Sequence, residues 1–282
     1  MNQLQLQTTV REALNEDLGS GDGTTEALVS ERDRTSAVLL AKQEGVVAGL
    51  LVAEAVYQQL DPTLQLHREV EEGERVTPGT VLAQLEGSTR ALLSGERVAL
   101  NFLQRLSGIA TVTRQVVDAL AGLDCQVLDT RKTTPGLRML EKYAVRIGGG
   151  SNHRFGLSHA VMIKDNHIAV AGSLARAVAR VREYNGPLVP VEVEADTLEQ
   201  VEEAVALDVD AILLDNMDPA TLRQAVERID GRIWTEASGG ITPETARQVA
   251  ETGVNGISLG WLTHSVDALD ISLDIQHKEE SI

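Results

Sequence analysis

The stretch VPVEVEADTLEQVEEAVALDVDAILLD, residues 189–215, contains the pattern that decides the fold. Residues 189–194 and 210–215 are short runs rich in valine, isoleucine and leucine that predict strands, and residues 197–207 have the spacing of an amphipathic helix. A strand, a helix and a second strand form the unit of a parallel sheet, because a parallel connection must cross from one end of the sheet to the other. The stretch therefore predicts a βαβ unit.

The same alternation continues on both sides of this unit. We expect strands at 125–129, 160–163, 189–194, 210–215, 232–237 and 256–259, and helices at 173–184, 197–207, 219–229 and 243–252. No GxGxxG sequence marks an open nucleotide-binding sheet. A (β/α) barrel is the natural closure of such repeats, but a complete barrel has eight strands. The predicted fold class is therefore α/β, with an irregular, incomplete (β/α) barrel.

A different organisation precedes the barrel. The expected elements are helices at 8–18, 49–60, 89–106 and 110–120, strands at 36–43 and 64–70, and a β hairpin segment at 71–86. We therefore expect an N-terminal α+β domain over residues 1–107 and the barrel with its active site over residues 108–263. Residues 264–282 are expected to form a C-terminal segment that packs back on the N-terminal domain.

The composition limits the classes of function. Hydrophobic residues make up 43% of the 282 residues, and charged residues 24%, as in ordinary globular proteins. A formal net charge of -17 disfavours nucleic-acid binding, which requires a basic surface. No apolar run is long enough to span a bilayer, and the first residues lack the pattern of a signal peptide. The single cysteine, Cys125, favours a reducing compartment and is expected to be a structural thiol. We expect a cytoplasmic protein without nucleic-acid or membrane partners.

One basic stretch, residues 129–167, contrasts with this acidic background. It contains seven Lys and Arg residues against three acidic residues, which predicts a pocket for a small, strongly anionic ligand. Arg131 and Lys132 follow the predicted strand 125–129, and Lys164 follows the strand 160–163, where α/β folds carry their chemistry. Three further cations share one helical stripe, which we interpret as a solvated face. They are Arg138, Lys142 and Arg146.

The later strands end in carboxylates and in a glycine-rich loop. Glu194 and Asp215 could stabilise a centre of positive charge, hold sugar hydroxyls or bind Mg²⁺. Residues 238–243, SGGITP, lead into a helix whose N-terminus could bind a phosphate, although a tight turn that needs two glycines explains the same sequence. The histidines have no zinc-site spacing, and Cys125 is isolated, so we predict no zinc site.

Six motifs in this order carry a family resemblance. They are TRKTTPGLR (130–138), GGGSNHRFGL (148–157), IKDNH (163–167), VEVE (191–194), LLDN (213–216) and SGGI (238–241). The sequence closely resembles the quinolinate phosphoribosyltransferases, also called carboxylating nicotinate-nucleotide pyrophosphorylases, over nearly its whole length. The resemblance implies a type II phosphoribosyltransferase fold. It also implies transfer of phosphoribosyl from phosphoribosyl pyrophosphate to quinolinate with Mg²⁺, which releases pyrophosphate and CO2 and gives nicotinate mononucleotide for NAD synthesis.

The resemblance also implies roles for individual residues. The quinolinate carboxylates would be held by Arg131, His153, Arg154 and Lys164. The phosphoribosyl donor would be held by Lys132, Glu194, Asp215, Ser238, Gly239, Gly240, Ser258 and Gly260. Of these groups, Lys132, Lys164, Glu194 and Asp215 would be catalytic, the two carboxylates with Mg²⁺. Arg97 would reach the site of a neighbouring subunit, so that a homodimer, or a hexamer built of three dimers, would be the active form.

Two residues depart from the pattern of this family, and the sequence leaves several alternative functions open. His159 stands where such sequences commonly have aspartate, and Trp261 where a small residue is usual. The paralogous branch associated with molybdenum transport shares the fold and much of the site. Lys164 at a strand end could instead form a Schiff base, as in an aldolase. Residues 71–86 resemble the hairpins of lipoyl and biotinyl carriers, but no lysine lies between Lys42 and Lys132 to carry the group.

Overall fold

The computed structural model describes residues 1–276, and the chain divides into two compact units. Unit 1 contains residues 1–114 and 134–149 together with the chain from Ser265 onward. Unit 2 contains residues 115–133 and 150–264. The last six residues of the predicted C-terminal segment lie outside the described residues.

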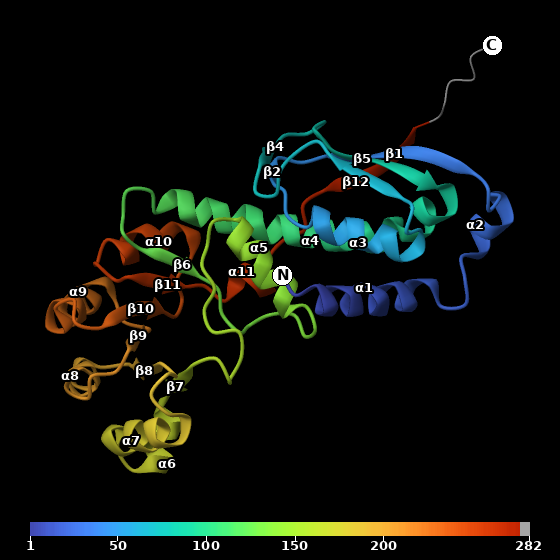
Figure 1. Ribbon diagram of the computed structural model, residues 1–282. Coiled ribbons are helices and arrows are strands. Elements are labelled where there is room, and N and C mark those ends of the chain that lie inside the picture. The colour runs from blue at the N-terminus through green and yellow to red at the C-terminus, as the bar shows by residue number, and fades with distance from the viewer. Residues whose placement is uncertain (277–282) are drawn as a thin grey trace. The chain divides into compact units, whose positions relative to one another are not determined.

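A four-stranded antiparallel sheet forms one layer of unit 1. Its strand order is β12 (Ile271–Gln276), β1 (Arg34–Ala41), β5 (Val81–Ser88) and β3 (Gln65–Arg68). Strand β12 pairs with β1 along its whole length, with Leu273 opposite Leu39, so the end of the described chain completes a sheet begun near its start. Figure 1 shows this sheet across the helices α3 (Leu50–Leu60) and α4 (Thr89–Ala119), with α1 (Gln3–Leu18) on their other side.

The smaller elements of unit 1 connect this framework. They are the helices α2 (Gly23–Leu28) and α5 (Arg138–Ile147) and the paired short strands β2 (Gly45–Val46) and β4 (Arg75–Val76). Within the predicted hairpin segment 71–86, β4 pairs with β2 and β5 pairs with β1 and β3, so these two strands do not form a hairpin with each other. Leucine, valine and alanine side chains from the helices and from the inner face of the sheet make the core of this unit.

Helix α4 corrects the prediction of two helices at 89–106 and 110–120, because it is continuous from Thr89 to Ala119. Gly108 lies between the two predicted helices, but a glycine inside a helix costs only about 1 kcal/mol and does not end it. A Cβ atom at Gly108 would lie 2.1 Å from the carbonyl oxygen of Asp267. The glycine therefore permits close approach of two backbones. The expected domain boundary at residue 108 falls inside this helix.

Helix α5 corrects the prediction of a solvated stripe at Arg138, Lys142 and Arg146. Arg146 is exposed, but Lys142 is only 2% exposed. The neighbouring Glu141 is fully buried and accepts hydrogen bonds from Arg105 Nε at 2.8 Å and Nη2 at 2.6 Å. The stripe prediction was wrong for Lys142 because this helix buries charged as well as apolar side chains, which helical spacing alone does not reveal.

A six-stranded parallel sheet forms unit 2. Its strand order is β6 (Gln126–Leu128), β11 (Gly256–Ser258), β10 (Trp234–Ser238), β9 (Ala211–Asp215), β8 (Val191–Ala195) and β7 (Val161–Ile163). All six predicted strands are present within a few residues of their expected bounds. Strands β6 and β7 are the two edges, and β6 is bridged instead to Ser151. The incomplete barrel is therefore confirmed.

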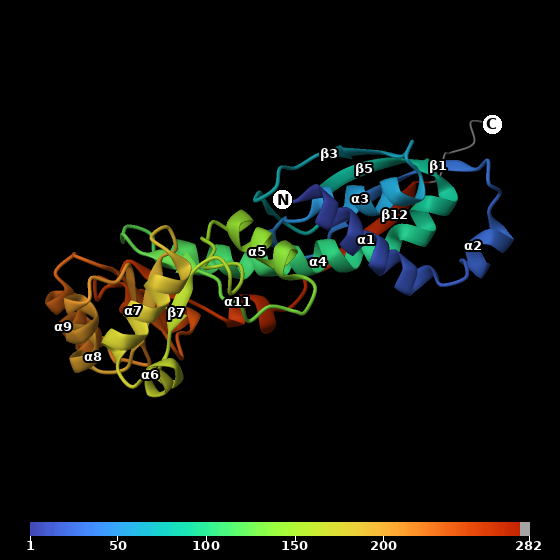
Figure 2. The ribbon, with the colours of Figure 1, turned by 60° about the horizontal axis from the view of Figure 1, so that its bottom comes forward.

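The helices of unit 2 cover the outside of this sheet. They are α6 (Asp165–Ala171), α7 (Leu174–Asn185), α8 (Leu198–Ala206), α9 (Pro219–Ile229), α10 (Pro243–Ala250) and α11 (Trp261–His264). Figure 2 shows α7, α8 and α9 along the outer side of the strands, where neighbouring helices pack on one another. Even polar strand residues such as Glu192 and Glu236 are buried.

Within residues 1–276, no helix combines the length and the apolar character that crossing a bilayer requires.

Candidate active site

The carboxyl ends of the six parallel strands surround one cavity of about 390 Å³, which lies entirely in unit 2. Side chains that follow parallel strands converge because all strands end at the same edge of the sheet. The cavity is lined by Thr130, Arg131, Lys132, His153, Arg154, Met162, Lys164, Glu194, Leu213, Asp215, Glu236, Ser238 and Ser258. The structure therefore brings together every predicted site residue except Arg97 and the three glycines.

The three glycines border the cavity without lining it. Gly239 has φ +95°, and a Cβ atom there would lie 2.1 Å from Asn216 Oδ1. A Cβ atom at Gly260 would lie 2.7 Å from Cδ of Lys132. The position of Gly239 therefore requires glycine for the loop after β10, whereas a side chain at Gly260 would only displace the end of the flexible Lys132 side chain.

Arg97 belongs to unit 1, where it is exposed on α4. Its neighbours Val98 and Ala99 are buried in the core of that unit. The described chain alone gives Arg97 no ligand-binding role.

Two arginines form the cationic side of the cavity. Arg154 is partly buried, and its Nη1 donates to the carbonyl oxygen of Ala160 at 2.8 Å, which fixes its direction. Burial and the charge of Arg131 both lower the pKa of Arg154 below its usual value. Two guanidinium groups that repel each other gain most from an anion placed between them, and a planar carboxylate can be bound by two parallel hydrogen bonds.

Carboxylates form the opposite side. Glu194 at the end of β8 pairs with the ammonium group of Lys164. Burial, followed by the charge of Glu194, raises the pKa of Asp215 on β9 above its usual value. The donor set therefore fits a magnesium ion: two oxygen ligands on adjacent strands are held close enough to disfavour each other's charge, which a divalent cation would relieve.

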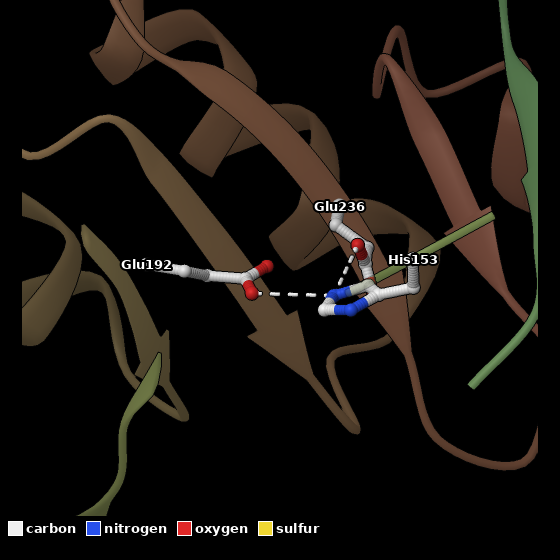
Figure 3. A group of neighbouring side chains, drawn as sticks. All are labelled: His153, Glu192 and Glu236. Atoms are coloured by element: carbon white, nitrogen blue, oxygen red, sulfur yellow. Dashed lines mark ion pairs between the residues drawn. The ribbon is translucent and has the colours of Figure 1, made fainter. Parts of the chain in front are cut away.

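A third group of charges consists of His153, Glu192 and Glu236 (Figure 3), of which His153 and Glu236 line the cavity. His153 Nε2 lies 3.2 Å from a carboxylate oxygen of Glu192 and 3.4 Å from one of Glu236. Glu236 is almost fully buried, and burial, together with the charge of Glu192, raises its pKa. Burial alone would lower the pKa of His153, but hydrogen bonds and charge from the two glutamates outweigh burial and raise it to about 9.

The other ring nitrogen of His153 has a defined partner. Its Nδ1 accepts a hydrogen bond from the backbone N–H of Arg154 at 2.8 Å. In the neutral ring the hydrogen is therefore on Nε2, directed at the two glutamates. The two glutamates favour a second proton on the ring, and a proton on Nδ1 would compete with the hydrogen bond from Arg154.

These three residues could in principle ligate a metal, since their ligand atoms lie within 4.8 Å of one another. A metal ion needs the lone pair of Nε2, and then the ring hydrogen would be on Nδ1. That hydrogen would clash with the Arg154 N–H, so the ring in this geometry is not poised for a metal.

Asp129 holds the segment that carries His153 and Arg154. This residue is fully buried at the end of β6. Its Oδ1 accepts from the backbone N–H of His153 at 2.9 Å, and its Oδ2 from Asn152 Nδ2 at 2.6 Å. We did not predict this role from the sequence, although the position of Asp129 at a strand end was a signal for it.

The loop after β10 leads into helix α10 as the sequence predicted. Ser238 lines the cavity, Gly239 and Gly240 have positive φ, and the helix begins at Pro243. Trp261, one of the two departures, donates from Nε1 to the carbonyl oxygen of Ile241 at 2.9 Å. Its indole therefore braces this loop and does not enter the cavity.

The remaining sequence candidates lie outside the cavity. His159, the second departure, is exposed and contacts the ring of Phe155 at a centroid distance of 5.7 Å. Cys125 is partly buried, and burial together with the charge of Asp124 raises the pKa of its thiol to about 11. A thiol with so high a pKa is a poor nucleophile at neutral pH.

Comparison with known proteins identifies relatives over the whole chain. The family model described as the C-terminal domain of quinolinate phosphoribosyl transferase matches residues 109–274, and the N-terminal domain model matches residues 22–107. A probable nicotinate-nucleotide pyrophosphorylase (carboxylating) of Bacillus subtilis is 49% identical over 282 residues, which is 100% of this chain and 97% of that protein.

Two further relatives show the same family likeness. The mitochondrial quinolinate phosphoribosyltransferase (decarboxylating) 2b of Nicotiana tabacum is 43% identical, with 96% of this chain and 82% of that protein covered. The crystal structure of NadC from Streptococcus pyogenes superposes with a TM-score of 0.95 at 43% identity, covering 99% of both chains.

Proposed function

The chain belongs to the quinolinate phosphoribosyltransferase family, and we propose that the cavity of unit 2 carries out the family's reaction with the residues that line it. The reaction transfers phosphoribosyl from phosphoribosyl pyrophosphate to the ring nitrogen of quinolinate. Pyrophosphate and CO2 leave, and nicotinate mononucleotide is formed for NAD synthesis. The observation that carries this function is the cavity whose lining combines Arg131, Arg154, Lys132 and Lys164 with the strand-end carboxylates Glu194 and Asp215.

We propose that the cationic side binds quinolinate. Arg131 and Arg154 have the planar donors that match two carboxylates on adjacent ring carbons, and His153 and Lys164 line the same cavity. This arrangement discriminates in favour of a dicarboxylate, because an acceptor with one carboxylate would leave one guanidinium group in the cavity without an anionic partner.

The donor is proposed to occupy the opposite side. Lys132, Ser238 and Ser258 lie in the cavity, and the backbone at Gly239 and Gly240 turns toward the N-terminus of α10, where a phosphate is favoured by the helix dipole. Gly260 leaves room for Lys132 to reach the phosphates.

Transfer requires no covalent nucleophile from the protein. As the bond from ribose to pyrophosphate breaks, positive charge grows on the ribose carbon, and Glu194 and Asp215 are placed to stabilise it. Magnesium, held by the same two carboxylates, would neutralise the departing pyrophosphate. Positioning two anionic substrates side by side is the main contribution of the protein.

Decarboxylation follows from the product of transfer. The carbon–carbon bond to the carboxylate next to the ring nitrogen breaks, and its electron pair stays on the ring carbon beside the positively charged nitrogen. That carbon then takes up a proton, and CO2 leaves. The charge on the nitrogen stabilises the carbanion, so little acid catalysis is needed.

Several finer features are part of the proposal. Arg97 is proposed to enter the cavity of a second copy of the chain, which makes a homodimer, alone or within a hexamer, the active form. Its exposed position on α4 leaves it available for such a contact. We also propose a cytoplasmic location, which the single cysteine and the substrates favour.

Two alternative functions have less support than the proposed one. A Schiff-base aldolase would need a free amine at Lys164, but an ammonium group that pairs with Glu194 has no lone pair for attack on a carbonyl. The branch associated with molybdenum transport would use the same fold for another acceptor. Retention of Arg131 together with the Asn152, His153 and Arg154 triplet favours the dicarboxylate.

An acceptor comparison tests the function. Purified protein with phosphoribosyl pyrophosphate and Mg²⁺ is expected to convert quinolinate to nicotinate mononucleotide, detected by mass spectrometry. Nicotinate in place of quinolinate, or removal of Mg²⁺ with a chelator, should reduce the product at least about 100-fold. Equal use of nicotinate would contradict the assignment of the two arginines.

A further inference from the structure

Glu192 and Glu236 present a problem of charge. Both are buried; Glu236 lines the cavity that is proposed to bind a dianion, and Glu192 pairs with the His153 ring that lines the same cavity. Buried carboxylates that repel the substrate would weaken binding unless they did something else. Neither residue has a place in the transfer reaction described above.

The contacts of Glu192 and Glu236 connect them, through the ring of His153, to Arg154, which is proposed to bind the substrate. Both carboxylates face Nε2 of His153, at 3.2 and 3.4 Å. On the opposite side of the same ring, Nδ1 accepts the backbone N–H of Arg154 at 2.8 Å. A ring held at both nitrogens cannot rotate without breaking a buried hydrogen bond, so its orientation fixes the backbone at Arg154.

We propose that Glu192 and Glu236 are positioning residues that aim the guanidinium group of Arg154 through the ring of His153. This inference rests on the proposed function, because it gives Arg154 the carboxylate-binding role. It explains why two acids are tolerated beside an anion site: one oxygen of each carboxylate pairs with the ring of His153, and the other oxygen of each is buried without a hydrogen-bond partner of its own.

The surrounding structure supports a positioning role. Asp129 holds the same segment from the other side, by hydrogen bonds to the His153 N–H and to Asn152. The Arg154 side chain is fixed farther along by the carbonyl oxygen of Ala160. Buried groups from β6, β8 and β10 therefore converge on a segment that has little regular structure of its own.

The segment also separates two spaces. A second cavity of about 350 Å³ lies at the amino ends of the strands, beside Gln126, Val191 and Trp234. His153, Arg154 and Glu236 line both cavities. One side of the segment therefore faces the second cavity. Fixed partners for the ring of His153 keep Arg154 directed at the substrate cavity and not at the second one.

Substitution of Glu236 tests the proposal. Glu236→Ala removes a carboxylate that pairs with the His153 ring and is expected to raise the KM for quinolinate about 10-fold to 100-fold. The KM for phosphoribosyl pyrophosphate and kcat should change by less than about 3-fold, because Arg154 does not touch the donor. Glu236→Gln keeps an acceptor oxygen and is expected to recover most of the loss.

A double-mutant cycle separates positioning from a general loss of stability. Glu236→Ala combined with Arg154→Ala should be no worse for quinolinate than Arg154→Ala alone, because both changes remove the same contact. Thr235→Ala is the matched control. It removes a buried hydroxyl on the same strand that bonds to Asn255, and should leave the quinolinate KM unchanged.

The proposal is overturned if Glu236→Ala keeps the wild-type KM for quinolinate, if Glu236→Gln is as impaired as Glu236→Ala, or if the two losses add. Should Glu236→Ala not fold, Glu192→Ala is used in the same cycle with the same expectations. A wild-type protein that does not turn over quinolinate would refute the proposed function itself, which distinguishes that failure from the failure of positioning.

Discussion

Arg154→Ala is expected to raise the KM for quinolinate by about 10-fold to 150-fold, the loss of about 1.5–3 kcal/mol that a hydrogen bond to a charged group contributes. The side chain lines the cavity, is partly buried, and is directed by Ala160. The KM for quinolinate should rise and that for phosphoribosyl pyrophosphate should not, because the donor is proposed to bind at Lys132 and the loop after β10. Steady-state kinetics with each substrate varied in turn measures both KM values.

The control for Arg154→Ala is Arg154→Lys, which retains the charge. Lysine cannot form two parallel hydrogen bonds to a carboxylate, so we expect only partial recovery. Full recovery would mean that charge alone suffices. An unchanged quinolinate KM in Arg154→Ala would show that the cationic side of the cavity does not bind the acceptor.

Mixing two inactive variants is expected to restore activity if the active site is shared between subunits. Arg97→Ala and Lys132→Ala should each lose nearly all activity, because one removes a contact across the interface and the other a contact to the donor. After mixing, about a quarter of wild-type activity should return, since about half of randomly paired dimers are hybrids and each hybrid has one intact site.

Two controls accompany the mixing experiment. Each variant mixed with itself should remain inactive, and light scattering should give at least a dimer for both. Arg11→Ala, which changes an exposed arginine on α1, should behave as wild type. Absence of recovery in dimers that exchange subunits would place Arg97 outside the active site.

The strands and their ends could be predicted from the sequence because their pattern is local. Residues 189–215 show strand, helix and strand directly, and the side chains after parallel strands must share one edge of the sheet. Lys132, Lys164, Glu194 and Asp215 followed from that rule, and the structure places all four in one cavity.

The remaining features depend on contacts between distant segments. Helical spacing could not show that α4 continues through Gly108. This glycine permits close approach of the Asp267 backbone, a contact between distant segments, and does not mark a helix end. Spacing also could not show that Lys142 is buried, or that Glu192 and Glu194, two residues apart on one strand, have different partners. Glu194 pairs with Lys164, whereas Glu192 faces His153 on another segment.

The most direct test of the account is the stoichiometry of the complete reaction. Protein incubated with carboxyl-labelled quinolinate, phosphoribosyl pyrophosphate and Mg²⁺ is assayed for labelled CO2 and pyrophosphate together. We predict equal amounts of the two products, and none of either when any component is omitted. Pyrophosphate without CO2 from quinolinate, or no release of either product at any Mg²⁺ concentration, would contradict the account.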